Sequence, residues 1–60
     1  MLVVCGSRFV EVISSAGGFE VSGLWEGQEV LSKRFEILPD ALLFASAIHE
    51  YGRRLEGIKQ

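Results

Sequence analysis

Cysteine and histidine are almost absent from this sequence of 60 residues, which has one of each, Cys5 and His49. A single cysteine cannot form a disulfide within the chain. A structural zinc site needs four ligands, usually cysteine or histidine, and two candidates cannot supply them. We therefore expect no metal and no cofactor. The unpaired thiol fits a reducing compartment, so we expect a cytoplasmic protein.

Long apolar runs and an excess of positive charge are also absent. No segment approaches the roughly 20 apolar residues of a membrane span, so we expect no membrane association. Six Lys/Arg against eight Asp/Glu give a net charge of −2. This balance lacks the basic footprint on which nucleic-acid affinity usually rests, so nucleic acid is a possible partner but not the favoured one.

What the sequence does contain is typical of a globular protein: 48% of its residues are apolar and 23% are charged. Residues 1–60 are enough for one small domain. A chain of this length buries only about 60% of its unfolded surface, which is near the limit for folding alone. With disulfides and zinc excluded, good packing or oligomerisation must stabilise it.

The first half of the chain has the composition of β-strands. Residues 2–14 are rich in valine, isoleucine and phenylalanine, with an interruption at Gly6-Ser7. The interruption is either a bulge in one long strand or a turn between two short ones, and we favour the bulge. Residues 19–25 alternate apolar and polar, Glu26-Gly27 predicts a hairpin turn, and residues 28–37 form the next strand.

The second half predicts one amphipathic helix. Pro39 suits its first turn, where the missing N–H is no loss. Gly52 either caps an early end or lies inside the helix, and we favour a helix that continues to about Gly57. One apolar stripe runs along this helix. It consists of Ala41, Phe44, Ile48, Tyr51, Leu55 and Ile58.

These elements predict an α+β fold, in which a three-stranded antiparallel β-meander packs on one C-terminal helix in two layers, in the order β-β-β-α. The helical stripe, with Tyr51 in the core, should cover one face of the sheet. Lys33 breaks the apolar pattern of its strand, and its charged end should extend outward from a sheet edge. The sheet side of the core should comprise Phe9, Ile13, Phe19, Val21, Trp25, Leu31, Phe35 and Ile37.

No pattern of residues favours catalysis. Cys5 lies in an apolar run, where a thiol packs as a small hydrophobic group and is inert. No serine stands in a nucleophile motif. Two pairs of glutamates, Glu26 with Glu29 and Glu50 with Glu56, should be solvated. A two-layer fold of this size also has little room for a pocket. We therefore expect neither an enzyme nor a small-molecule substrate.

Binding of a protein partner is the favoured hypothesis. A helix of about 20 residues spans about 30 Å, which is longer than strands of seven residues, so Leu55 and Ile58 should overhang the sheet. Leu42, Ala45 and His49 lie on the helix side away from the stripe. We expect these five residues to bind a partner, most simply a second copy of the chain in a homodimer.

The sequence thus predicts a non-enzymatic interaction or regulatory module, of the accessory type found among small bacterial and phage proteins. The alternative is a nucleic-acid-binding module in which exposed aromatic rings stack on bases. Its phosphate contacts would come from two basic doublets, Lys33-Arg34 and Arg53-Arg54.

Overall fold

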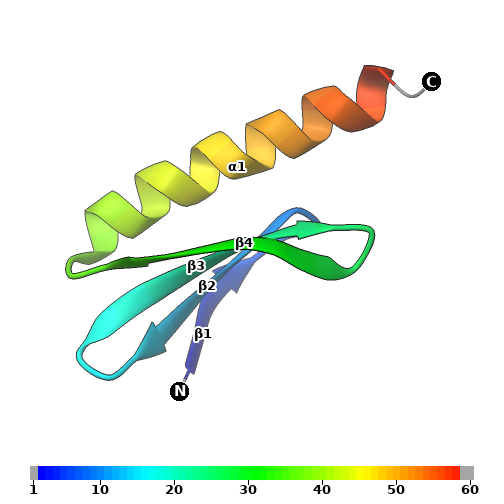
Figure 1. Ribbon diagram of the computed structural model, residues 1–60. Coiled ribbons are helices and arrows are strands. Elements are labelled where there is room, and N and C mark those ends of the chain that lie inside the picture. Colours follow the sequence, from blue (N-terminus) through cyan, green and yellow to red (C-terminus); the bar gives the residue numbers. More distant parts are fainter. Residues whose placement is uncertain (1, 59–60) are drawn as a thin grey trace.

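The computed structural model describes residues 2–58, which form a four-stranded antiparallel sheet followed by one helix (Figure 1). The strands lie side by side in the order of the sequence, so the sheet is a simple meander. The helix packs against one face, as the α+β prediction requires. The elements are β1 (Leu2–Gly6), β2 (Val10–Ser15), β3 (Gly18–Trp25), β4 (Gln28–Phe35) and α1 (Leu38–Ile58).

The prediction of three strands was wrong, because the chain turns at Gly6-Ser7 and residues 2–14 form two strands. The Ser7 amide donates to the Val10 carbonyl at 2.7 Å, and the Phe9 amide donates to the Ser7 hydroxyl at 3.3 Å. A serine side chain that bonds nearby backbone in this way stabilises a turn. A bulge does occur, but it lies inside β1, where the pairing with β2 shifts between Val3 and Cys5.

Two-residue turns connect β2 to β3 and β3 to β4. The predicted turn at Glu26-Gly27 is confirmed, with φ angles of 55° and 82°. The other turn uses Ala16 and Gly17, with φ angles of 49° and 76°. Paired positive φ angles match the right-handed twist of the adjoining strands, which is why such turns close hairpins.

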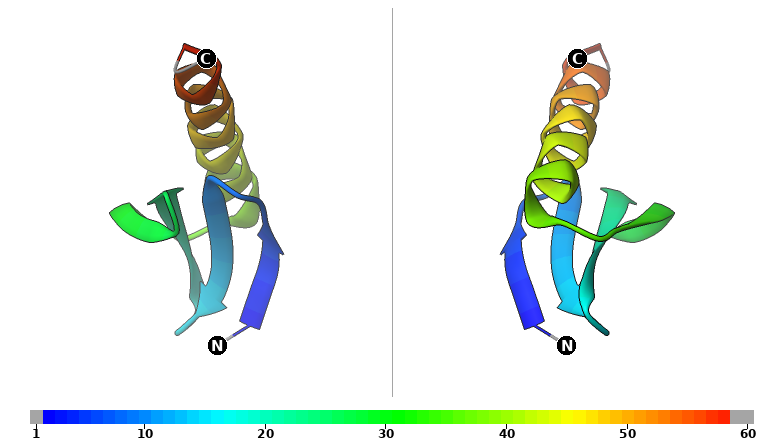
Figure 2. Two further views of the ribbon diagram at one scale, coloured as in Figure 1. Left: turned by 90° about the vertical axis from the view of Figure 1, so that its right-hand side faces the viewer. Right: turned by 90° about the vertical axis from the view of Figure 1, so that its left-hand side faces the viewer.

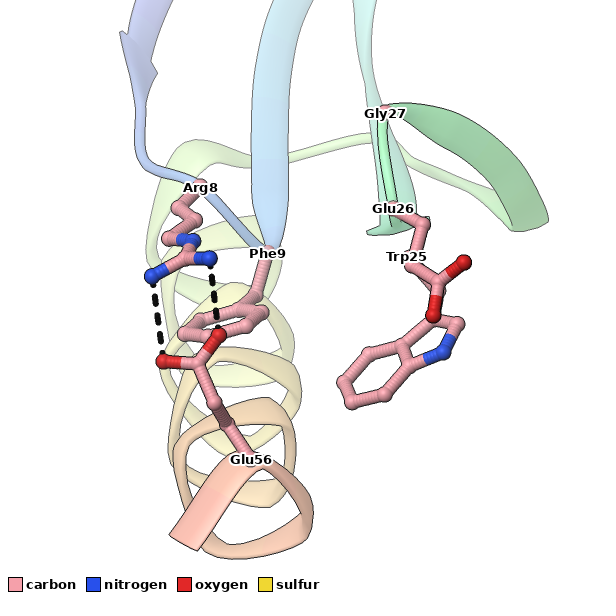
Figure 3. Close-up of a pocket in the computed structure, with 6 residues that line it drawn as sticks. All are labelled: Arg8, Phe9, Trp25, Glu26, Gly27 and Glu56. Carbon is pink, nitrogen blue, oxygen red and sulfur yellow. Dashed lines mark hydrogen bonds and ion pairs between the residues drawn. The ribbon is translucent and has the colours of Figure 1, made fainter. Parts of the chain in front are cut away.

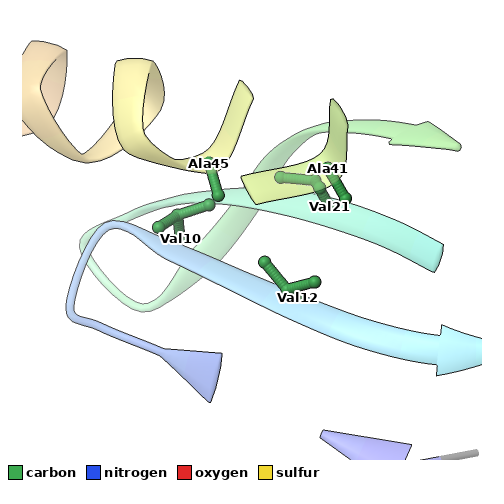
Figure 4. Packing of buried hydrophobic residues seen from close by; sticks show 5 residues of the cluster. All are labelled: Val10, Val12, Val21, Ala41 and Ala45. Carbon is green, nitrogen blue, oxygen red and sulfur yellow. The ribbon is translucent and has the colours of Figure 1, made fainter. Parts of the chain in front are cut away.

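The core lies between the helix and one face of β2 and β3 (Figure 4). Side chains alternate between the two faces of a strand, and the cross-strand pair Val12 and Val21 is completely buried under the helix. Ile13 therefore faces the opposite side of the sheet. Its prediction as a core residue was wrong, and the reason is that both parities of residues 9–13 are largely apolar. The buried cluster comprises Val10, Val12, Val21, Ala41 and Ala45.

Other predicted core residues have mixed outcomes. Phe9 and Val21 are buried, and Phe19, Trp25 and Phe35 are half-buried. Two predictions were wrong, because Leu31 and Ile37 are exposed. Leu31 pairs with Gly23 on the helix side of the sheet, but β4 is an edge strand. Ile37 follows β4 in the link to the helix and has no sheet neighbour to cover it.

The helix contacts the sheet through only part of the predicted stripe, in which Ala41 is buried and Phe44 and Ile48 pack against the buried cluster. Ala41, Ala45 and Gly52 are its buried positions, whereas Tyr51 is 63% exposed. The placement of Tyr51 in the core and of Ala45 on the outer side was therefore wrong. The cause is the Phe9 ring, which lies directly under Gly52, so that a Cβ there would be 2.5 Å from Phe9 Cγ. Only a helix rotated toward its small residues can approach this closely.

The helix continues past Gly52 to Ile58, as predicted. It packs on β3, β2 and β4 and does not approach β1. Its last turns rise away from the sheet, which makes the molecule elongated, with extents of 40 × 19 × 16 Å (Figure 2). Within residues 2–58, no helix has the length and apolar character needed to cross a membrane.

Lys33 has the predicted position on an edge strand. It pairs with the buried Val21, so its side chain is on the helix side of the sheet. The ammonium group lies 5.6 Å from the ring centroids of both Phe35 and Phe44, whose rings contact each other. An ammonium group over aromatic faces gains a favourable cation–π interaction while its charge stays near water.

Candidate interaction surfaces

A shallow groove of about 260 Å³ lies between β1 and the helix, and we call it the β1 groove. Leu42, Ala45 and His49, three of the predicted partner-binding residues, line it together. Leu42 is 41% exposed, but Ala45 is buried and belongs to the floor of the groove. The prediction that Ala45 offers a contact surface does not fit this position, because its methyl group already packs on the sheet.

Cys5 also lines the β1 groove, and its side chain is exposed. The prediction of a buried Cys5 was wrong. An apolar run at the start of a chain usually indicates a buried strand, but here β1 is an edge strand that the helix does not reach. Every described residue of β1 is exposed, including three large aliphatic ones in succession, Leu2, Val3 and Val4.

His49 is half-buried rather than exposed, which corrects the sequence-based expectation. Its Nδ1 lies 2.9 Å from the Ser7 hydroxyl, and its ring packs 5.7 Å from that of Phe9. The turn at 7–9 is thereby fastened to the helix. Sequence reasoning missed Ser7, because nothing in the pattern connects it to a residue 42 positions away.

A serine hydroxyl beside a histidine nitrogen is also the arrangement of a nucleophile and its base. In this protein the Ser7 hydroxyl also accepts a hydrogen bond from the Phe9 amide. The pair therefore joins the turn at 7–9 to the helix through a hydroxyl that the turn itself also uses.

The other flank of the helix borders a second groove of about 230 Å³, which we call the β4 groove. Leu55 lines this groove and is half-buried, so it is less exposed than the predicted overhang requires. Ile58 lies beyond it in the last turn and is 80% exposed. The lining is largely apolar and includes Leu24, Trp25, Val30, Leu31, Ile48, Tyr51 and Leu55.

A third hollow, of about 360 Å³, lies between the turn at 26–27 and the end of the helix (Figure 3). An ion pair lines one side of it, in which Arg8 contacts both carboxylate oxygens of Glu56 at 2.8 and 3.0 Å. The guanidinium also lies 5.6 Å from the Phe9 ring centroid, and Trp25 stacks on Phe9 at 6.2 Å. Since the Arg8 side chain is 71% exposed, this pair connects turn and helix but contributes little stability.

The basic residues of the nucleic-acid alternative do not form one surface. Neighbours on a strand face opposite ways, so Lys33 and Arg34 are on different faces of the sheet. Arg34 is also engaged, because its guanidinium donates at 2.8 Å to two backbone carbonyls at 15–16. Arg53 and Arg54 share the Glu50 carboxylate at 3.4 Å each, on the exposed side of the helix.

The fold and these surfaces define a small α+β protein with an open apolar groove on each side of its helix. Within the part of the chain that the structure describes, no group of three acidic, histidine or cysteine side chains is placed to hold a metal ion. Comparisons of the chain with known protein families, with curated proteins and with solved structures gave no match.

Proposed function

We propose that this protein is a non-enzymatic protein-interaction module that works as a homodimer, in an accessory or regulatory role in the cytoplasm. The observation that supports it most is the imbalance between core and surface. In residues 2–58, six hydrophobic residues are buried and ten large ones are exposed. Single exposed leucines are normal, but clusters of them beside open grooves are typical of binding surfaces.

The surface area points the same way. A monomeric protein of 6.6 kDa is expected to expose about 3,900 Å². This chain exposes 4294 Å². The excess of about 400 Å² approaches the roughly 500 Å² that each partner contributes to a small specific interface. A second copy would therefore bring the chain close to the compactness of a typical folded protein.

Light scattering coupled to size exclusion, run over a series of protein concentrations, tests the proposal. A mass that approaches twice 6.6 kDa as concentration rises is the expected result. A mass of one chain at every concentration would remove the homodimer. Ile58→Glu and Leu42→Glu change exposed side chains of the helix. Loss of the dimer by Ile58→Glu with unchanged circular dichroism would place the end of the helix at the interface, whereas loss by Leu42→Glu alone would place the β1 groove there.

The nucleic-acid alternative has its own test. Electrophoretic mobility of single-stranded and duplex DNA at low salt should be unaffected by the protein. A salt-dependent shift, weakened by the double change Arg53→Gln and Arg54→Gln, would favour the alternative instead.

A further inference from the structure

The two edges of the sheet differ in charge. β1 contains no charged residue, and none occurs before Arg8. Strand β4 contains Glu29, Lys33 and Arg34. Charged side chains, above all an inward-facing lysine such as Lys33, are the usual means by which a protein prevents its edge strand from pairing with another chain. Each edge strand also has one bulge, so bulges do not distinguish the two.

The two edges also differ in cover. The helix packs on β4 but does not approach β1. Below and above β1, apolar side chains remain open: Val3 is 57% exposed on the face away from the helix, and Leu42 is 41% exposed across the β1 groove. An uncharged, uncovered edge strand presents free backbone donors and acceptors together with apolar side chains on both faces.

We infer that β1 is the dimer interface, where it pairs antiparallel with β1 of a second copy to form one eight-stranded sheet. This inference rests on the proposed homodimer and adds its location. An uncharged strand is complementary to itself, because no like charges meet when two copies pair. Antiparallel pairing of identical strands has twofold symmetry, so it closes after two copies and uses both β1 edges. The outer edges are then the two β4 strands with their lysines.

Pairing of β1 with β1 of a second copy is favoured over pairing of β1 with β4 of another molecule. Pairing of β1 with β4 would leave a free edge at each end and would grow into a filament. Lys33 and Arg34 oppose that outcome, whereas no charged residue of β1 opposes self-pairing. The two β1 grooves would meet over the joined strands, with Leu42 of each copy facing the junction.

A distance measurement locates the interface without a label in it. A nitroxide is attached after Ser32→Cys, in a Cys5→Ser background, so that each chain carries one label on the exposed strand β4. In a sheet joined at β1 the two labelled strands are seven strand spacings apart, which is on the order of 30 Å. Double electron–electron resonance spectroscopy should show this distance between the two labels. A distance below about 20 Å would place β4 at the interface and overturn the inference.

Two exposed valines, one on each edge, provide a matched pair of variants. Val3 is 57% exposed on β1 and Val30 is 62% exposed on β4. Val3→Lys should raise the dissociation constant of the dimer at least about tenfold, because two lysines then meet in an apolar junction. Val30→Lys should leave it unchanged within about twofold. Circular dichroism verifies that both variants fold.

The outcomes separate the two proposals. A wild-type chain that stays monomeric refutes both the proposed homodimer and the assignment of β1 as its interface. A wild-type dimer that survives Val3→Lys but dissociates with Val30→Lys keeps the homodimer and refutes β1 as its interface. A dimer that tolerates both lysines also refutes β1, and directs attention to the helix.

Discussion

Replacement of Gly52 by alanine tests how the helix is seated. In an exposed helix this change stabilises by roughly 1 kcal/mol, because alanine has the higher helix propensity. Here the added Cβ would lie 2.5, 2.7 and 2.8 Å from three atoms of Phe9. Carbon atoms in favourable contact are about 3.5–4.0 Å apart, so either the helix or the ring must move by about an ångström.

The Phe9 ring has little room to move. It is buried, stacks on Trp25 at 6.2 Å and packs against His49 at 5.7 Å. Overpacking of this kind typically costs 1–3 kcal/mol. After the gain in helix propensity of roughly 1 kcal/mol, we expect Gly52→Ala to lower the free energy of unfolding by up to about 2 kcal/mol. For a protein of this size that is a fall in Tm of up to about 15 °C.

Gly57 provides the control. It lies in the same helix, but no atom would be within 4 Å of its added Cβ. Gly57→Ala should therefore stabilise by up to about 1 kcal/mol. Urea and thermal unfolding, followed by circular dichroism at one fixed protein concentration, measure both variants. If Gly52→Ala stabilises as Gly57→Ala does, the close packing of Phe9 on the helix is refuted.

Replacing the Phe9 ring with a smaller side chain should relieve the clash with the Cβ at position 52. In a Phe9→Leu background, Gly52→Ala should cost less than in the wild type, with a coupling free energy of about 0.5–3 kcal/mol between the two positions. Additive effects would mean that the destabilisation by Gly52→Ala has another cause than the Phe9 ring.

Three further changes test local contacts. Ala16→Asn should stabilise by about 1 kcal/mol, because the φ of 49° is a left-handed conformation that asparagine adopts more readily; calorimetry that shows a lower Tm would contradict this. Arg34→Gln removes two hydrogen bonds to the turn at 15–16 and should destabilise by about 1 kcal/mol, with faster amide exchange in that hairpin and unchanged exchange at 26–27. Ser7→Ala should cost about 1 kcal/mol and shift the His49 Nδ1 resonance, and an unmoved resonance would disprove the hydrogen bond.

Local patterns predicted much of the fold, because they reflect local physics. The helix could be predicted because apolar residues recur at helical spacing from Ala41 to Ile58 and Pro39 fits its first turn. The hairpin at Glu26-Gly27 could be predicted from the glycine and the alternating strand before it. The overhang of Ile58 follows from helix length alone.

What could not be predicted depends on contacts between distant residues. Residues 9–13 read Phe-Val-Glu-Val-Ile, so alternation does not decide whether the odd or the even positions face the core. The structure selects Val10 and Val12, because Phe9 turns under the helix from the preceding loop. The rotation of the helix depends on that same ring. The predicted stripe consequently included Ala41 but missed Ala45 and Gly52, the other two buried positions of the helix.

The candidate surface was predicted to a similar degree. Leu42 and His49 do lie together in one groove, because they are neighbours on the same side of a helix. Ala45 lies between them in sequence but faces inward, which the pattern of large residues concealed. Cys5 and Ser7 join the groove from another element, and only the fold of β1 against β2 brings them there.

The two grooves have different physical origins, and this difference bears on which of them fits the proposed interface better. The β4 groove is partly a consequence of helix seating, because a helix that approaches through Gly52 must leave Tyr51 at its flank. Exposure there satisfies a packing requirement of the chain itself. No such requirement explains β1: the helix does not approach it, and its exposed aliphatic side chains relieve no constraint in the core. An apolar strand that the core does not use is better explained by a partner, which is why we place the proposed interface at β1 although the β4 groove has the more apolar lining.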